Sequence, residues 1–340
     1  MKIIFTSVIL LSIVCGYSQD IHFSQFSETP LFLNPANAGM IEGACRASVN
    51  YKTQWIAMGN PYRTMFASYD MPLLKTKNKP AYFGIGGYFY SDKAGDAHLG
   101  IASGNLSFSA VVPLNKENSL SAGFQTGFVQ RSASMSNLQF PNQYNGVAYD
   151  AAMPSNETSS LNPFSYFDLS SGINYQFLKN NGNIEGKDIF KINVGAAYFH
   201  INQPQQKFYP NAINRLYGKM VFNASVRYDF PQTKFGVVGS ALFMSQGAAK
   251  EIDFGGLARY KLTRGTKVTG FISESAIAGG MLYRVNDAVI PQFLFEIANF
   301  GIGISYDVNV SSLSLATHKA GGLEISLKYS NIKDALFQNK

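Results

Sequence analysis

The 340-residue sequence contains little charge and almost no cysteine. Asp, Glu, Lys and Arg make up 14% of the residues, whereas a soluble domain typically carries about 25%. Of the two cysteines, Cys15 lies in an apolar leader, so a chain without the leader can form no intramolecular disulfide and no cysteine-based metal site. Beyond the leader there is no run of about eighteen apolar residues, which excludes a later transmembrane helix.

Residues that commonly carry catalysis are sparse and scattered. The sequence has no GxSxG or HExxH motif, and its histidines show no ligand-like spacing. The histidines are His22, His98, His200 and His318. Several carboxylates could be catalytic, but pairing with nearby basic residues is the simpler interpretation. The carboxylates are Asp168, Asp229, Glu251 and Asp253, and the basic residues are Lys52, Arg131, Arg227 and Arg259. We therefore expect no enzyme activity, no cofactor and no metal.

The positive charge is spread along the chain. The formal net charge is +7, and Lys and Arg form no basic run that would bind nucleic acid. Basic turns beside the headgroups of outer-membrane lipid account for this charge. We expect no nucleic-acid partner.

The first 18 residues read as a signal peptide. Lys2 precedes an apolar run over 3–14, and small residues follow it. That run is too short to span a bilayer as a helix. Lipidation at Cys15 is the alternative, but Val14 stands where a small residue is required.

From Cys45 onward the dominant pattern has a period of two, which is typical of β-strands. Apolar and polar side chains alternate in 45–55, 119–131, 166–177, 219–230 and 300–310. Val49 and Tyr51, for example, fall on one face, and Ser48 and Asn50 on the other. These segments have the length of tilted strands that cross a bilayer, and aromatic residues gather near their ends.

The sequence therefore predicts an all-β fold, a transmembrane antiparallel β-barrel over residues 44–330. A soluble β-sandwich is the alternative, but its strands are shorter and its exposed faces carry more charge. Fifteen segments can be counted, yet a barrel with both termini on one side needs an even number. Because the region 266–285 can be two short strands or one, we predict about fourteen strands. An arginine at Val49 or Phe124 should disrupt assembly, and one at Ser48 or Gln125 should do little.

Connections between the predicted strands alternate between short and long. The two long ones, 132–165 and 203–218, come out on the same side, which is the outer side in barrels of this kind. We predict that they bind a protein partner, because they are rich in aromatic anchors. The candidate residues are Phe140, Tyr144, Tyr149, Met153, Phe164, Phe208 and Tyr209. In the alternative, these anchors fold inward and plug the barrel.

Several motifs resemble those of the PorP/SprF family, outer-membrane components of the type IX secretion system. They are HFSQFSETPLFLNPANAG (22–39), NYKTQW (50–55), PYRTMFASYD (61–70) and, near the C-terminus, DAVIPQF, FGIGISYDVN and GGLEISLKYS. The resemblance covers nearly all of the chain after the leader. Its most specific residues are Ser24, Gln25, Phe26, Pro30, Asn34, Pro35, Gly39, Tyr51, Gln54 and Trp55. Residues 27–29 depart from the family pattern.

The resemblance implies a role in secretion and a fourteen-stranded barrel of the fatty-acid-transporter type. It also implies two partners, a periplasmic lipoprotein of the secretion machinery and a secreted, adhesin-like surface protein, with a link to gliding motility. A diffusion channel or hydrophobic-solute transporter is the alternative function. A transporter needs a continuous path through the lumen, whereas an anchor for a surface protein should be plugged.

Two segments flank the predicted barrel. Residues 19–43 are expected to form a periplasmic lead-in that folds under the barrel, with Phe26, Leu31 and Phe32 buried and a turn at Asn34-Pro35. Docking of a periplasmic partner is the alternative role for this segment. Residues 331–340 form a C-terminal tail of unassigned role.

Overall fold

The computed structural model describes residues 20–55, 61–75, 81–95, 97–134, 138–156, 162–183, 186–208, 214–263, 275–311 and 320–331. The predicted signal peptide and the C-terminal tail after Asn331 lie outside the described residues.

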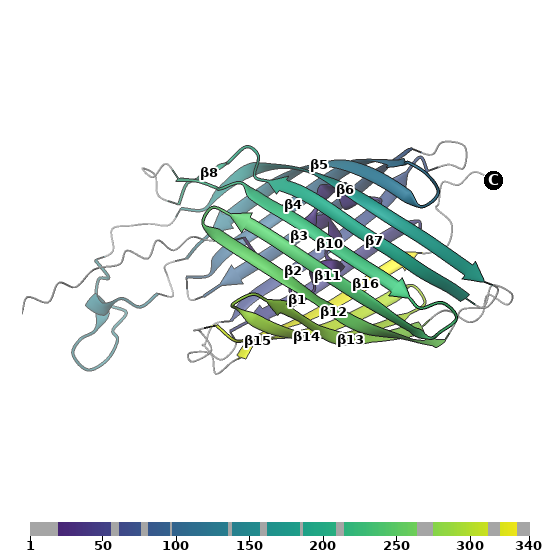
Figure 1. Ribbon diagram of the computed structural model, residues 1–340. Coiled ribbons are helices and arrows are strands. Elements are labelled where there is room, and N and C mark those ends of the chain that lie inside the picture. The colour runs from purple at the N-terminus through teal and green to yellow at the C-terminus, as the bar shows by residue number, and fades with distance from the viewer. Residues whose placement is uncertain are drawn as a thin grey trace, which may run out of the picture.

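Fourteen antiparallel strands of the described chain form a closed barrel (Figure 1). They are β1 (Cys45–Gln54), β2 (Tyr62–Leu73), β3 (Tyr82–Ala94), β4 (Leu99–Pro113), β5 (Asn118–Ser132), β6 (Phe164–Asn183), β7 (Gly186–Phe199), β10 (Lys219–Asp229), β11 (Phe235–Gln246), β12 (Ala249–Thr263), β13 (Ser275–Arg284), β14 (Ala288–Ile297), β15 (Phe300–Asn309) and β16 (Ala320–Asn331). Because β1 pairs with both β2 and β16, the sheet has no open edge. The predicted count of fourteen is confirmed. In the region 266–285, where the sequence allowed one strand or two, the described residues contain one strand, β13.

Side chains alternate across the barrel wall as the period of two predicts. In β1 the side chain of Val49 is 48% exposed, whereas Ser48 and Asn50 are buried. In β5, Phe124 faces outward and Gln125 is buried. A soluble sandwich buries its large apolar side chains, but here they cover the outer surface, where lipid can solvate them. The sandwich alternative is therefore excluded.

Aromatic side chains form clusters on the outer surface near both ends of the strands. Near one end the ring of Phe190 lies 5.4 Å from those of Phe177 and Tyr228. Near the other end Phe128 packs edge-on against Phe167, with ring centroids 5.5 Å apart. Two such bands are typical of the lipid–water interfaces of membrane barrels.

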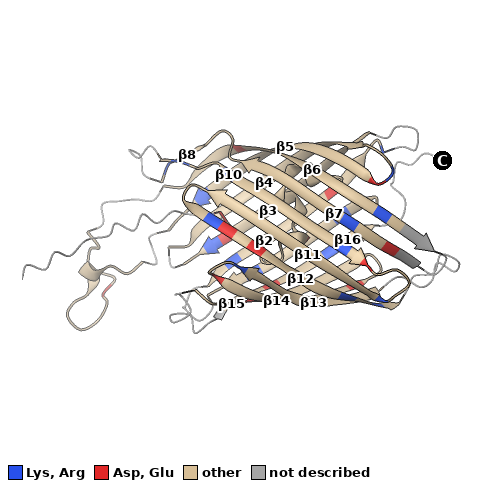
Figure 2. Ribbon diagram, in the orientation of Figure 1, with Lys and Arg blue, Asp and Glu red and all other residues tan. Residues whose placement is uncertain are grey.

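The two ends of the barrel differ in the length of their connections. We call the end that carries 133–163 and 200–218 the long-loop end, and the opposite end, with 114–117 and 230–234, the short-turn end. The second long loop contains a two-stranded sheet of β8 (Gln205–Gln206) and β9 (Asn214–Arg215). Charged residues lie mainly toward the strand ends, with long uncharged stretches between them (Figure 2).

Residues 20–44, which we call the plug, run through the inside of the barrel (Figure 1, purple). They contain η1 (Phe26–Glu28), α1 (Pro30–Leu33) and η2 (Pro35–Asn37). The amide of Asp20 contacts the Gln246 side chain at the long-loop end, and the Ala44 amide donates to the Asn331 carbonyl at the short-turn end. In the described residues no helix is long and apolar enough to cross a membrane.

The position of this segment differs from the prediction. Phe26, Leu31 and Phe32 are buried and Asn34-Pro35 opens a turn, as expected, but the segment fills the lumen instead of folding beneath the barrel. The physical reason is space, because inward-facing residues of the wall are often small and leave room for a second layer of chain.

The outward face of the wall generates a first prediction. Val49→Arg or Phe124→Arg should cost about 2–4 kcal/mol of folding free energy, because each places a charge in the apolar band. Heat-modifiable gel mobility of the purified protein measures the loss of assembled barrel. Val147→Arg, at a loop position that is 88% exposed, is the matched control and should assemble normally. Equal tolerance of all three charges would contradict the assignment of the lipid face.

The inward face requires a revised expectation. The sequence predicted that arginine at Ser48 or Gln125 would do little, but both side chains are buried in a filled lumen. Arginine at either position should therefore displace the plug.

Candidate functional site

The plug passes so close to the inner wall that several wall positions have no room for a side chain. A Cβ atom added to Gly123 in β5 would lie 2.5 Å from the backbone nitrogen of Ala36. At Gly84 in β3 a Cβ atom would overlap the carbonyl of Ala38. Glycine in a strand often marks such a close approach of another backbone segment. The wall is thus shaped to fit the plug.

Asn34 connects the turn of the plug to two strands. Its Oδ1 accepts a hydrogen bond from the Ala36 amide at 2.9 Å, which caps η2. Its Nδ2 donates to the carbonyl of Ile173 in β6 at 2.8 Å and to that of Ala196 in β7 at 3.3 Å. Asn34 is fully buried, so these bonds satisfy an amide that would otherwise be costly to bury. The Asn-Pro pair of the family motif therefore has a structural role.

Ser24 and Gln25 bind the last strand and its neighbour. Glu324 in β16 accepts hydrogen bonds from the Ser24 amide at 2.7 Å and from the Gln25 amide at 3.2 Å. Ser326 donates to the Gln25 side chain at 2.7 Å. The Ser24 hydroxyl donates to Asp307 in β15 at 2.6 Å. These contacts attach the beginning of the plug to the strands that close the barrel.

Gly39 forms a turn near the C-terminal end of the plug. Its φ of +64° is left-handed, which favours glycine, and its amide donates to Asp70 in β2 at 2.9 Å. The guanidinium of Arg46 donates to both oxygens of Asp70 at 2.9 Å and to the Asn37 carbonyl at 3.1 Å. A buried carboxylate thus holds the glycine turn and an arginine together.

Two apolar clusters complete the contact between plug and wall. In the first, the Phe32 ring lies 5.3 to 6.1 Å from four other rings, all of them edge-on to it. Those rings belong to Phe23, Phe66, Tyr88 and Tyr90. In the second, Phe26 and Leu33 lie among wall residues of β7, β10, β11, β13 and β14. Both clusters bury surface that the empty lumen would expose to water.

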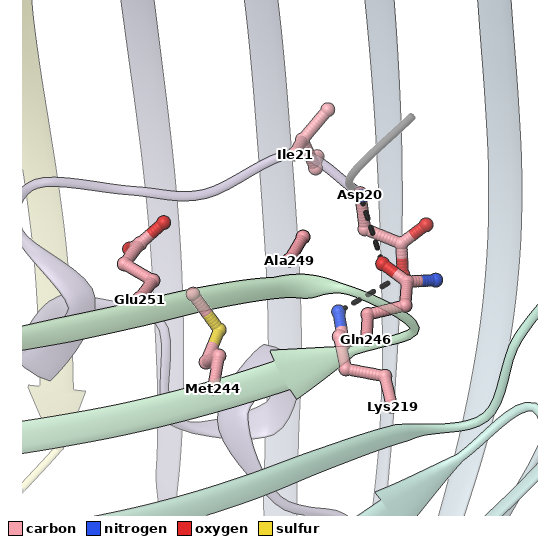
Figure 3. A pocket seen from close by; sticks show the side chains of 7 residues that line it. All are labelled: Asp20, Ile21, Lys219, Met244, Gln246, Ala249 and Glu251. Atoms are coloured by element: carbon pink, nitrogen blue, oxygen red, sulfur yellow. Dashed lines mark hydrogen bonds and ion pairs between the residues drawn. The ribbon is translucent and has the colours of Figure 1, made fainter. Parts of the chain in front are cut away.

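At the long-loop end, an ion-pair cluster holds the first described residue of the plug. His200, just after β7, lies between Asp20 and Asp168, with nitrogen–oxygen distances of 2.7 Å and 2.9 Å. Lys219 lies 3.0 Å from Asp20, whose amide donates to Gln246 (Figure 3). Two carboxylates thus face two basic side chains.

The pKa values of this cluster follow from its geometry. Burial lowers the pKa of His200, but the carboxylates of Asp20 and Asp168 outweigh it and raise the pKa to about 9. Burial raises the pKa of Asp20, but Lys219 and His200 outweigh it and hold the pKa well below its usual value. Lys219 and His200 therefore both favour the charged form of Asp20.

The family-motif residues do not form a single site. Seven belong to the plug, namely Ser24, Gln25, Phe26, Pro30, Asn34, Pro35 and Gly39. Tyr51 faces outward and is 40% exposed. Gln54 and Trp55 lie at the long-loop end of β1, where they line a cavity with Asp20.

The residues predicted to bind a partner lie in two places. Residues 138–156, which we call the hairpin loop, extend beyond the barrel (Figure 1). In this loop Tyr144 and Tyr149 pair through their backbones and are 57% and 41% exposed, with Val147 at the tip. Phe140 and Met153 are half-buried, and the Gln143 side chain donates to the Met153 carbonyl. The described part of this loop does not enter the lumen, which disagrees with the alternative in which its aromatic anchors fold inward and plug the barrel.

The other predicted anchors lie beside the barrel rim. The Phe164 and Phe208 rings meet edge-on with centroids 4.8 Å apart, and Arg131 donates to Gln206 at 3.5 Å. Tyr209 lies outside the described residues.

The residues considered for chemistry are mostly apart. His200 contacts Asp168, but His98 is exposed and Glu251 contacts His22 and Arg284 instead. His318 lies outside the described residues. In the described ranges no group of three or more His, Cys, Asp or Glu is placed to hold a metal ion.

Sequence reasoning missed the wall residues that bind the plug. Glu324, Asp70 and Gly123 lie at inward positions of the alternating pattern, and that pattern is the signal that could have found them. It marks a residue as facing the lumen but does not say which residue it meets there.

Comparison with known proteins identifies a family. The model of "Type IX secretion system membrane protein PorP/SprF" matches residues 15–329. No curated protein matches the chain. Similar solved structures include the TodX monoaromatic hydrocarbon channel deltaS2 mutant, at 8% identity over 89% of this chain and 94% of that one, with a TM-score of 0.46. BamA from Haemophilus ducreyi, lacking POTRA domains 1–3, shares 8% identity over 85% and 70% of the two chains, with a TM-score of 0.43.

The fit of the plug generates a second prediction. Gly123→Val should displace the plug, because overpacking typically costs about 1–3 kcal/mol and the overlapping atoms are backbone. The barrel should still assemble, because valine favours strands. Planar-bilayer recordings should then show a conductance that the original protein lacks. Gly104→Val, where a Cβ atom meets nothing within 4 Å, is the control and should stay closed. A closed Gly123→Val barrel would contradict the assignment of the plug.

The ion-pair cluster generates a third prediction, on pH. Because the pKa of His200 is raised to about 9, its stabilisation is complete below about pH 6.5 and is lost as the pH rises through 9. The loss is on the order of 3 kcal/mol, since one pKa unit is about 1.4 kcal/mol. The thermal unfolding midpoint should fall between pH 6.5 and 10 by more in the original protein than in His200→Asn. Parallel curves for the two proteins would argue against this anchor.

Proposed function

The chain belongs to the PorP/SprF family of type IX secretion system membrane proteins, and from this we propose that it holds a secreted partner at the cell surface. It is an outer-membrane β-barrel and a component of that secretion system. Its proposed part is to support export or surface retention of an adhesin-like protein and, through that protein, gliding motility. The proposed mechanism is recognition without catalysis.

The exposed apolar tip of the hairpin loop is the observation that carries this proposal. Tyr144, Val147 and Tyr149 lie exposed on a loop whose lower part is organised by its own hydrogen bonds. Tyrosine supplies a large, rigid and amphipathic contact surface at low entropic cost. A protein partner that covers these side chains removes apolar surface from water. By the rule that long loops face outward, this tip points away from the cell.

The filled lumen supports an anchor over a conduit. A diffusion channel or hydrophobic-solute transporter requires a path along the barrel axis, and here the plug crosses the lumen from Asp20 to Ala44. Buried hydrogen bonds and two aromatic or aliphatic clusters hold it in place. Opening a path would require all of these contacts to break.

Other partners of the secretion system would meet the opposite end. A periplasmic lipoprotein would contact the short-turn end, where the last plug residues emerge. There Glu42 is exposed and lies 3.7 Å from Lys191. This end is the proposed contact with the core machinery.

Removal of the hairpin loop tests the proposal. The Asn142 side chain donates to the Ser155 carbonyl, so the ends of the segment 142–155 are already close and its deletion should leave the barrel intact. Surface immunoblotting of intact cells should show loss of secreted adhesins. Planar bilayers should show that the barrel remains closed. Retention of every surface protein after the deletion would refute the role of this loop.

Point variants separate the apolar tip from the rest of the loop. Replacing Tyr144, Val147 and Tyr149 together by serine should weaken surface retention about as strongly as the deletion, because interface energy concentrates in a few large side chains. Replacing Ala151 and Ala152 by serine, at exposed positions of the same loop, is the matched control and should change little.

A further inference from the structure

A polar cavity lies at the long-loop end, between the first plug residues and the ends of six strands, namely β1, β2, β3, β13, β15 and β16. Its volume is about 220 Å³, enough for several waters at about 30 Å³ each. Trp55, Tyr62 and Asp92 line one part of it, and Arg284 and Asp287 line another. The Asp287 side chain is 40% exposed, so the cavity communicates with solvent.

The charges beside this cavity are not balanced. Arg284 lies within 3.1 to 3.6 Å of four carboxylates, which belong to Glu251, Asp253, Asp287 and Asp307. Lys52 lies 3.5 Å from Asp307. In the described ranges these two cations and the histidine His22 are the ion-pair partners of this group. Asp287 is partly solvated, but Glu251, Asp253 and Asp307 are buried, and three buried carboxylates beside two cations leave the group short of positive charge.

His22 does not supply the missing charge. Its Nδ1 lies 3.2 Å from Glu251, but burial, together with Lys52, Arg284 and Lys219, lowers the pKa of His22 well below its usual value. The ring is therefore neutral at physiological pH. Four carboxylates thus share two permanent cations.

Asp92 extends this excess of negative charge to the other wall of the cavity. Its one hydrogen bond in the described residues is from the Thr64 hydroxyl, at 2.6 Å. Trp55 and Tyr62 stand beside it as an edge-on pair with ring centroids 4.6 Å apart. An aromatic face next to a carboxylate is the environment that attracts an ammonium or guanidinium group.

The shape and composition of the cavity indicate an organic cation. In the described residues no cluster of His, Cys, Asp or Glu has a metal-holding arrangement. We propose that this cavity binds a lysine or arginine side chain of the secreted partner. The identity of the partner rests on the proposed function, whereas affinity for the cationic group follows from the cavity itself. Gln54 and Trp55, the end of the second family motif, would then form part of a binding site.

The sequence offers a direct probe of this cavity. Trp55 is its only tryptophan, so intrinsic fluorescence of the purified full chain reports on this position. Titration with N-acetyl-arginine amide or N-acetyl-lysine amide should give a saturable change, and N-acetyl-glutamine amide should not. Raising the salt concentration should weaken the response. No saturable change, or an equal change with the glutamine amide or with MgCl₂, would overturn the proposal.

Single substitutions test the acidic wall. Asp92→Asn should weaken binding of the arginine probe about tenfold, the effect expected for losing a charged hydrogen-bond partner. Asp150→Asn, in the hairpin loop, is the matched control and should bind as the original protein does. If Asp92→Asn fails to assemble by heat-modifiable mobility, Asp287→Asn carries the test. Unchanged probe affinity in an assembled variant would refute the assignment.

The hairpin-loop deletion separates this inference from the proposed function. The deletion variant should still bind the arginine probe, because residues 142–155 do not line the cavity. Adhesin retention with normal probe binding would refute the proposed function alone. Adhesin loss in the deletion, with no probe binding in the original protein, would refute the cavity alone.

Discussion

The need to fill the lumen is the constraint on which the rest of this structure depends. Closing fourteen strands satisfies their backbone groups but leaves an inner wall of small and polar side chains around open space. The plug supplies the missing layer. Its backbone lies against glycines such as Gly123, its amide groups meet carboxylates such as Glu324, and its rings meet aromatic residues of the wall. Lipid solvates one face of the wall, and residues 20–44 cover much of the other.

Charge is distributed differently on the two sides of the plug entrance. On one side Asp20 and Asp168 face Lys219 and His200, and this group is balanced. On the other side carboxylates outnumber cations around Arg284. The first group is suited to hold the plug, because each charge has a partner within the chain. The second is suited to accept a charge from outside. Anchoring and binding can therefore occur a short distance apart.

The sequence predicts the strands of the barrel wall better than it predicts the plug inside them. Strand alternation follows from local chemistry, so residues such as Val49 and Ser48 can be assigned to opposite faces directly, and the even strand number follows from topology. The plug has no period, and its shape depends on distant residues. Asn34 bonds to Ile173, 139 positions away. From the sequence alone, the aromatic residues of the hairpin loop could either fill the lumen or form an outer binding surface. Only the fold distinguishes these two positions. Likewise, the sequence marks Gln54 and Trp55 as part of a family motif, but it does not predict that they line a cavity.

The contact between the plug and β16 also determines the order in which the protein can reach its final state. Gln25 is made early in synthesis, yet its side chain accepts a hydrogen bond from Ser326, 301 positions later. Contacts of such separation form late, because the intervening chain must first be ordered. The plug therefore docks fully only after the last strand is in place. In a barrel that has not closed, the plug is not docked. The aromatic residues of the plug then remain accessible to chaperones and proteases. The N-terminal plug and the C-terminal strand thus complete their contacts together, at the end of folding.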